Sequence, residues 1–312
     1  MGPRILITGA TGFIGGRVAA KAAIAAEPGH VRLLVRRPAA PPGRPGTETV
    51  PGDLRDPDSL RRACEGIDVL VHCASAIGAD EEVSRAVNDE GTRSLVDAAV
   101  RAGASRIVSL STASVHGRGP FRAAAPGTLP LAPGSTTSRT RAAGERHVLE
   151  AGGTVLRPHL VYGTGDRQLM PGVVRLLAAL PGPLDGGDSL HSLIDVDSLA
   201  GALLDAALSP RTQPGPHYVN HPEPVPVARL LAAGEGLLAG TPGTRGPVVT
   251  VAEARALLAD VPFAQHHLAM LATDHWFADD RPWREWGSDP GSGFAATIAD
   301  HAPWYRRLLG DS

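Results

Sequence analysis

The sequence predicts an α/β fold, a Rossmann-type doubly wound parallel sheet with a smaller C-terminal substrate lobe. Three observations lead to this prediction. An apolar strand at Arg4–Thr8 runs into a glycine-rich turn and a helix, and β-rich runs then alternate with helical stretches. After Pro158 the elements become shorter and are separated by Pro and Gly. We therefore expect a Rossmann domain over 1–158, with a returning segment near 191–220, and a mainly substrate-binding lobe over 159–312.

The first half alternates strand and helix in the order that parallel sheets require. The expected strands are Arg4–Thr8, Val31–Val35, Asp68–Cys73, Arg106–Leu110 and Thr154–Leu156. The expected helices lie between them, near Phe13–Ala26, Asp58–Cys64, Val83–Ala102 and Ser135–Glu150. Residues 38–46 and 117–134 are rich in Pro and Gly, so we expect surface loops there.

Aromatic residues are concentrated near the C-terminus of the chain. They are Trp276, Phe277, Trp283, Trp286, Trp304 and Tyr305. Side chains of this kind either fill the core of a small lobe or line an aromatic binding wall. The sequence leaves both interpretations open.

The composition excludes several classes of protein and partner. With 43% hydrophobic and 20% charged residues, the 312-residue chain can bury a full core. A net charge of −2 gives no field that would attract nucleic acid or an anionic membrane, so we expect a small-molecule partner. Residues 1–20 show no signal peptide, and no apolar run has the length of a membrane span, so we expect a cytoplasmic protein.

Metal and disulfide chemistry have no signature in the spacing of the residues. The two cysteines, Cys64 and Cys73, are too few for a disulfide framework or a zinc site. No HExxH motif or Cys/His cluster occurs, so we expect no metal site. No Gly-x-Ser-x-Gly elbow indicates acyl transfer.

The strongest local signal is the first turn between strand and helix. Glycine permits backbone conformations and close approaches that other residues do not, and the following helix presents free N–H groups to a diphosphate. The spacing is G-x-x-G-x-x-G, and the expected cofactor-binding residues there are Gly9, Thr11, Gly12, Phe13, Ile14 and Gly15. The turn therefore predicts a dinucleotide cofactor.

The end of the second expected strand indicates which dinucleotide is bound. NAD-binding folds place an acid there to hold the ribose hydroxyl, whereas this chain has Arg36 and Arg37. A guanidinium pairs with a 2′-phosphate in a bidentate fork. We expect NADP(H) to be preferred over NAD(H), although two solvated arginines at the start of a loop would look the same in the sequence.

Several motifs in order resemble the extended short-chain dehydrogenases/reductases, also called the NAD-dependent epimerase/dehydratase family. They are Gly52-Asp53-Leu54, Val71-His72-Cys73-Ala74-Ser75-Ala76, Asn88-Asp89-Glu90-Gly91-Thr92, the segment 156–163 and the segment 194–200, in which Ser198 departs from the family's second Asp. The resemblance implies cofactor contacts for Asp53, Leu54, Ala74, Ser75, Ala76, Asn88, Ser111, Pro158, Leu160 and Val161. It also implies a homodimer formed through the helices near Val83–Ala102 and Ser135–Glu150.

The catalytic end departs from the family pattern. Ser111-Thr112-Ala113-Ser114-Val115-His116-Gly117 is similar to the strand-five motif and puts Thr112 at the catalytic hydroxyl position. The family's Tyr-x-x-x-Lys corresponds to Thr137 and Arg141, so the resemblance places both in the expected catalytic set and implies a ribose contact for Arg141. No realignment restores the pair, because Lys21 is the only lysine and Tyr162, Tyr218 and Tyr305 are far from this helix in the sequence.

A substitute proton donor is therefore expected near the nicotinamide. His159 occupies a position where the family usually has a small residue, and an imidazole acts as acid or base near neutral pH. The expected substrate-binding residues are Ala76, His116, Tyr162 and His191. Each histidine could equally be structural, since the chain has 12.

Three functions are consistent with an intact cofactor end beside an altered catalytic helix. The first is an NADP(H)-dependent oxidoreductase with a biosynthetic role, which acts on a carbonyl or alcohol of a small metabolite through Thr112 and a nearby group. The second is a non-redox epimerase, dehydratase or cyclase on the same scaffold. The third is a non-enzymatic NADP-binding sensor.

Overall fold

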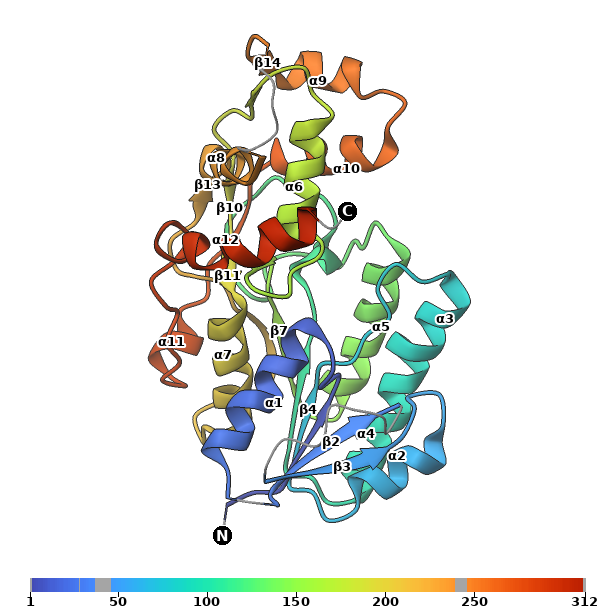
Figure 1. The fold of residues 1–312 in the computed structure, drawn as a ribbon. Coiled ribbons are helices and arrows are strands. Elements are labelled where there is room, and N and C mark those ends of the chain that lie inside the picture. The colour runs from blue at the N-terminus through green and yellow to red at the C-terminus, as the bar shows by residue number, and fades with distance from the viewer. Residues whose placement is uncertain (1, 28, 37–45, 239–245, 311–312) are drawn as a thin grey trace.

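The computed structural model describes residues 2–27, 29–36, 46–238 and 246–310. A large parallel sheet with its helices forms one part of the molecule, and a smaller lobe of short strands and helices covers one end of it (Figure 1). None of the helices in these ranges is both long and apolar enough to cross a bilayer.

The large sheet has seven parallel strands in the order β12-β7-β5-β4-β1-β2-β3. These strands are β1 (Ile5–Thr8), β2 (Val31–Val35), β3 (Thr47–Pro51), β4 (Val69–His72), β5 (Arg106–Leu110), β7 (Thr154–Arg157) and β12 (Gly215–Tyr218). β1 lies between β2 and β4, with Ile5 opposite both Val31 and Val69. The chain therefore reverses its direction of winding between β1 and β4, which confirms the predicted doubly wound class.

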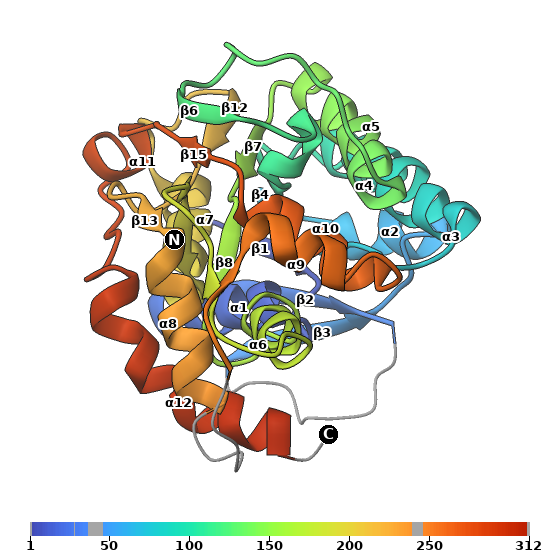
Figure 2. The same cartoon turned by 90° about the horizontal axis from the view of Figure 1, so that it is seen from above.

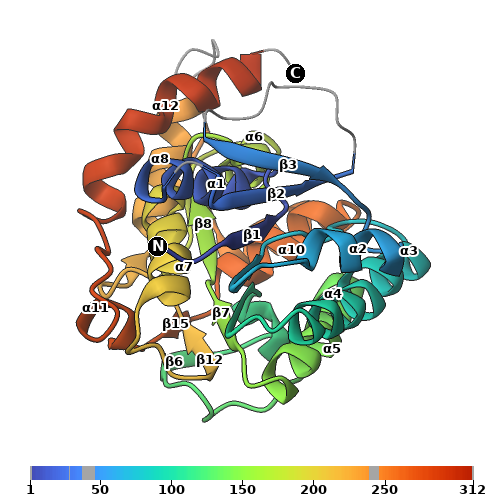
Figure 3. The same cartoon turned by 90° about the horizontal axis from the view of Figure 1, so that it is seen from below.

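Helices cover both faces of this sheet (Figure 3). One face carries α1 (Phe13–Ala25) and α7 (Val196–Leu208), and the other carries α2 (Pro57–Cys64), α4 (Thr92–Arg101) and α5 (Thr136–Glu150). Apolar side chains from each face of the strands fill a separate core beneath each helical layer. The inner strands, such as β1 and β4, are buried on both faces, which explains why they read as continuous apolar runs.

The expected helix near Val83–Ala102 is interrupted. It consists of α3 (Glu81–Arg85), a π-helical turn at Ala86–Gly91 and α4. Helix α5 packs against this turn through Gly144, where a Cβ atom would lie 2.1 Å from the Asn88 carbonyl oxygen. The π turn and the glycine together bring α5 close to the loop that follows β4.

The smaller lobe contains a four-stranded sheet in the order β13-β10-β15-β6. These strands are β6 (Phe121–Ala124), β10 (Leu190–His191), β13 (Val225–Pro226) and β15 (His275–Phe277), and two further pairs are β8 (Leu160–Tyr162) with β11 (Leu193–Asp195) and β9 (Leu184–Asp185) with β14 (Val249–Thr250). The helices are α6 (Leu169–Ala178), α8 (Val227–Leu238), α9 (Val251–Leu257), α10 (Pro262–Leu271), α11 (Arg281–Arg284) and α12 (Phe294–Gly310). Figure 2 shows α6 and α10 over the end of the large sheet.

The structure differs from the sequence predictions in three segments. The expected loop at 117–134 contains β6, and β3 and β12 were not predicted, because their charged, His and Pro residues suit edge strands rather than a buried run. The late aromatics belong to the core: Phe277, Trp286 and Tyr305 are buried in hydrophobic clusters. Of the expected loop at 38–46, residues 38–45 lie outside the described residues.

Candidate functional site

A cavity of about 1100 Å³ opens beyond the carboxyl ends of the strands, at the point where the winding reverses. Its wall begins at the glycine turn after β1, passes the ends of β2, β4 and β5, and reaches α6 and α10 of the smaller lobe. Open α/β sheets bind ligands at this switch point. The cavity is therefore the candidate functional site.

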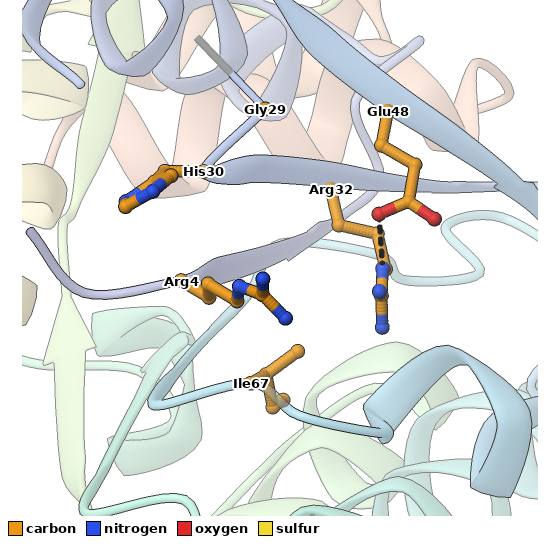
Figure 4. A pocket seen from close by; sticks show the side chains of 6 residues that line it. All are labelled: Arg4, Gly29, His30, Arg32, Glu48 and Ile67. Atoms are coloured by element: carbon orange, nitrogen blue, oxygen red, sulfur yellow. Dashed lines mark hydrogen bonds and ion pairs between the residues drawn. The ribbon is translucent and has the colours of Figure 1, made fainter. Parts of the chain in front are cut away.

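A second, smaller pocket lies at the opposite end of the strands (Figure 4). Its volume is about 110 Å³, and it is lined by Arg4, Gly29, His30, Arg32, Glu48 and Ile67. The Nε atom of Arg32 donates to Glu48 at 2.8 Å, and its Nη1 atom donates to the carbonyls of Ala63 and Glu65. The guanidinium is thus committed to partners within the protein, so the pocket is not a candidate site.

The glycine turn forms the part of the cavity wall that is built from backbone. Gly9 has a φ of +71°, and a Cβ atom there would lie 2.7 Å from the Ala74 nitrogen. At Gly15 a Cβ atom would lie 2.3 Å from the Gly9 carbonyl oxygen. Gly12 precedes α1 and caps it with no side chain, so the helix N-terminus faces the cavity with its N–H groups available. These residues fit a diphosphate.

The predicted residues of this turn and of the adenine side largely line the cavity. They are Gly9, Thr11, Gly12, Phe13, Ile14 and Gly15 from the turn, and Arg36, Asp53 and Leu54 from the ends of β2 and β3. Arg37 lies outside the described residues. Arg55, which sequence reasoning missed, also lines the wall, and its guanidinium pairs with Asp53 at 2.9 Å and lowers the pKa of that carboxyl.

The loop after β4 supplies Ala74, Ser75 and Ala76 to the cavity wall, whereas Asn88 stands behind them. The side-chain Oδ1 atom of Asn88 accepts hydrogen bonds from the Ala76 N–H at 2.7 Å and the Ser75 hydroxyl at 3.0 Å. Its amide nitrogen donates to the Ala76 carbonyl at 2.9 Å and to Thr140 at 3.0 Å. Asn88 therefore positions the loop and does not line the cavity, contrary to the expected direct contact.

The catalytic end gathers hydroxyl groups around the end of β5. Ser111, Thr112, Ser114 and Arg141 line the cavity. The Thr112 Oγ1 atom lies 3.2 Å from the exposed Ser114 hydroxyl, to which it donates, and accepts from the Ser114 N–H at 3.2 Å. Arg141 donates from Nη2 to the Leu110 carbonyl at 2.8 Å, and burial lowers its pKa. The hydroxyl position of the motif thus has a second hydroxyl beside it.

Thr137 does not line the cavity, which corrects its place in the expected catalytic set. Its Oγ1 atom accepts a hydrogen bond of 3.5 Å from the N–H of Gly78, in the exposed loop after β4. A short side chain on this helix reaches the loop rather than the space over the sheet. The position of the family's tyrosine therefore carries no group that faces a substrate.

On the substrate side, Pro158, His159, Leu160 and Val161 line the cavity, but His116 does not. His116 is 4% exposed; its Nδ1 donates to the Pro130 carbonyl and its Nε2 accepts from the Tyr218 hydroxyl, each at 2.8 Å. Beside it Arg157 pairs with Glu145 at 2.5 Å. Tyr218 is thus close in space to α5, from which it is distant in the sequence. His116 belongs to this buried network, which corrects its expected role in substrate binding.

Tyr162 and His191 are also absent from the cavity wall. The Tyr162 hydroxyl lies 2.8 Å from the Thr297 Oγ1 atom of α12, and burial raises its pKa to about 12. His191 is fully buried. Tyr162 packs against Phe294 of α12 and His191 stacks with His275, so both side chains are held within the smaller lobe.

Sequence reasoning missed most of the substrate wall. The missed residues are Ile77, Ala79, Val83 and Val87 near α3, Arg167, Gln168, Leu169 and Arg175 of α6 and the preceding loop, and Phe263, His266, His267 and Met270 of α10. No helix was predicted over these late residues, and the adjacent His266 and His267 were a local signal that was not used. Nothing in the sequence indicates that this helix folds back over the cavity.

Three histidines come together although their spacing predicted no metal cluster. His159, His191 and His275 each place a potential ligand atom within 4.8 Å of the others. They lie far apart in the chain and meet only because β10 and β15 pair beside the start of β8. The expectation based on spacing thus missed a group that the fold assembles.

Comparisons with known proteins agree with this geometry. The sequence model of the NAD dependent epimerase/dehydratase family matches residues 5–220. A 3 beta-hydroxysteroid dehydrogenase/Delta 5-->4-isomerase of Mycobacterium tuberculosis is 32% identical over 71% of this chain and 66% of its own length. Sterol demethylase protein B of Methylococcus capsulatus is 30% identical over 96% of this chain and 98% of its own.

Solved structures share the fold over nearly the whole chain. The Bordetella bronchiseptica enzyme WbmH, solved in complex with NAD+, superimposes with a TM-score of 0.77 at 17% identity. The superposition covers 98% of this chain and 99% of that structure. This likeness concerns the fold, and the roles of individual side chains rest on the site itself.

Proposed function

Because the chain belongs to the NAD-dependent epimerase/dehydratase family, we propose that it is an NADP(H)-dependent oxidoreductase that interconverts an alcohol and a carbonyl on a small, largely apolar metabolite. The main support for this proposal is one continuous cavity that joins the glycine turn to Thr112 and Arg141. A sensor would need the first part of this wall but not the second.

The proposed preference for NADP(H) rests on the two arginines of the adenine side. Arg36 is exposed at the end of β2 and lines the cavity together with Arg55. Asp53, whose negative charge would repel a phosphate, is already paired with Arg55 at 2.9 Å. The wall thus presents an excess of positive charge where a 2′-phosphate would lie.

Thr112 and Ser114 offer a route for the proton in place of the family's tyrosine. When bound, the nicotinamide supplies or accepts the hydride. Thr112 would donate its hydroxyl proton to the substrate oxygen and recover one from Ser114, 3.2 Å away and exposed to solvent. Burial lowers the pKa of His159 well below its usual value, so its ring carries no extra proton at neutral pH and we do not assign the delivery to it.

The substrate wall supports a largely apolar substrate with a polar end. Ile77, Leu169, Phe263 and Met270 contribute apolar surface, and Arg175 lies over the Phe263 ring at 5.7 Å from its centroid. The relatives named above are, by their names, a steroid dehydrogenase and a sterol demethylation protein. We therefore propose ring or long-chain hydroxy and oxo compounds as the substrate class.

The test is turnover by the purified full chain with NADPH or NADH and a panel of steroid ketones, long-chain 3-oxo acids and the matching alcohols. We expect a change in nicotinamide absorbance with at least one compound and a lower KM for NADPH than for NADH. Cofactor binding without turnover of any compound would contradict the proposed redox function. Product formation without a change in absorbance would indicate the non-redox alternative.

A further inference from the structure

The group of three histidines lies beside the cavity, where β8 begins and β10 pairs with β15. His159 immediately precedes β8 and lines the cavity, while His191 and His275 stand opposite one another on the paired strands β10 and β15. The ring centroid of His159 lies 5.3 Å from that of His275 and 6.2 Å from that of His191. The planes of the three rings lie within 17° of one another.

Two ring nitrogens in this group are buried and have no partner among the described residues. They are Nε2 of His159 and Nδ1 of His191. The other nitrogen of His191, Nε2, lies 3.1 Å from the Leu271 carbonyl, which only accepts, so Nε2 carries the hydrogen and Nδ1 keeps its lone pair. Buried polar atoms rarely lack a partner, and such an atom needs an explanation.

The third histidine shows the same arrangement. Nδ1 of His275 donates to the Thr273 carbonyl at 2.8 Å, which leaves the lone pair on Nε2. This lone pair accepts a hydrogen bond of 3.1 Å from the Gly119 N–H. Metal-binding histidines usually donate their second ring nitrogen to a carbonyl or carboxylate, and His191 and His275 both do so here.

We propose that His159, His191 and His275 bind one divalent transition-metal ion of the zinc class, through Nε2, Nδ1 and Nε2 respectively. Three neutral imidazoles form a donor set that suits Zn²⁺, Co²⁺ and Ni²⁺ and not Mg²⁺ or Ca²⁺. Binding exchanges the Gly119 hydrogen bond of His275 for a metal bond.

The geometry requires only a local adjustment. The candidate donor atoms are within 4.8 Å of one another, whereas metal–nitrogen bonds of about 2.1 Å place tetrahedral ligands about 3.4 Å apart. Small rotations of the rings would bring the donor atoms to this separation. The backbone of His159 would stay in place during such a rotation, because its N–H donates to the side-chain oxygen of Asn220 at 2.8 Å. The ion would thereby join the strand beside the nicotinamide end to the sheet of the smaller lobe.

The experiment uses the full chain after chelator treatment, titrated with Co²⁺ alone and then with Zn²⁺ as a competitor. We expect one equivalent of Co²⁺ to bind with the visible absorption of low-coordinate nitrogen ligation, and Zn²⁺ to displace it and raise Tm. His191→Asn and His275→Asn should each weaken binding by at least about tenfold. His221→Gln is the matched control, since His221 lies outside the cluster and contacts the backbone of Glu223, and should bind like the wild type.

Circular dichroism and the Tm of the metal-free proteins establish whether the variants fold. If they do not, X-ray absorption of the Co²⁺-loaded wild type counts the imidazole ligands directly, and we expect three. Absence of stoichiometric binding by the folded wild type would overturn the proposal. Binding that persists in His191→Asn, or fewer than three imidazole ligands, would overturn it as well.

Discussion

The glycine turn after β1 and the helix α5 stand on different walls of the same cavity, and they are held in different ways. The turn is fixed by backbone contacts, such as that of Gly15 against the Gly9 carbonyl. On α5, Arg141 reaches the cavity while Thr137 turns to the loop at Gly78. The geometry of the wall built from backbone therefore depends on the spacing of the glycines, whereas the chemistry of the wall built from side chains changes with single residues.

Gly15→Val should have the largest effect, because it introduces a side chain where the backbone of the glycine turn leaves no space for one. A Cβ atom would lie 2.3 Å from the Gly9 carbonyl oxygen and 3.1 Å from the Cys73 Cβ atom, and neither can move away freely. We expect stability to fall by about 1–3 kcal/mol and NADPH affinity by at least about 100-fold. Isothermal titration and thermal unfolding measure the two effects.

Gly201→Ala is the control for this change. Gly201 lies within α7, and a Cβ atom there would meet nothing within 4 Å. Alanine favours a helix over glycine, so we expect stability to rise by about 0.5–1 kcal/mol with no change in NADPH affinity. Equal NADPH affinity in Gly15→Val and the wild type would mean that the turn does not hold the nucleotide.

Thr112→Val tests the side-chain wall directly. Valine keeps the shape of threonine but removes the hydroxyl, so nucleotide binding should be unchanged while kcat falls by about 10²–10⁴-fold. Pre-steady-state and steady-state turnover of the substrate found in the panel measure this. Thr128→Val, at an exposed turn where the hydroxyl donates to the Ala125 carbonyl, is the control and should keep full activity. Undiminished kcat in Thr112→Val would remove the hydroxyl route.

The same contrast explains which features the sequence could predict. The five inner strands of the large sheet and the glycine turn follow from local apolar runs and spacing, so their positions were predicted closely. The edge strand β12 was not predicted, because Pro216 and His217 interrupt the apolar pattern by which strands are recognised. The substrate wall from α6 and α10 depends on contacts between distant segments, which one sequence does not encode in any local pattern.

The directions of the side chains were the second feature that the sequence did not predict. His116, Tyr162 and His191 occupy the expected strands and loops but point into buried networks. Their chemistry suggested substrate contacts, and only the packing around each shows otherwise. For the same reason, the meeting of His191 with His275 could not be predicted, since it depends on the pairing of two strands of two and three residues.

Arg36→Ala should have an intermediate effect, because it removes a side chain from the backbone-built half of the cavity. Loss of a charge-assisted pair with a 2′-phosphate should raise the KM for NADPH by about 10–100-fold and leave the KM for NADH nearly unchanged. Steady-state kinetics with both cofactors measure the split. Arg101→Ala, at the exposed end of α4, should change neither value. An equal rise for both cofactors would argue against recognition of the phosphate.

Thr137→Val should have the smallest effect, although it changes the position that carries the family's tyrosine. Only a hydrogen bond of 3.5 Å to the exposed Gly78 is lost, so we expect kcat, KM and stability to stay within about twofold or 0.5 kcal/mol of the wild type. Turnover of Thr137→Val beside Thr112→Val measures the difference. A loss of activity in Thr137→Val comparable to that in Thr112→Val would mean that α5 moves toward the substrate during turnover. An unchanged kcat in Thr137→Val together with a large loss of kcat in Thr112→Val would assign proton transfer to the hydroxyls that follow β5. The role of α5 would then be to hold Arg141.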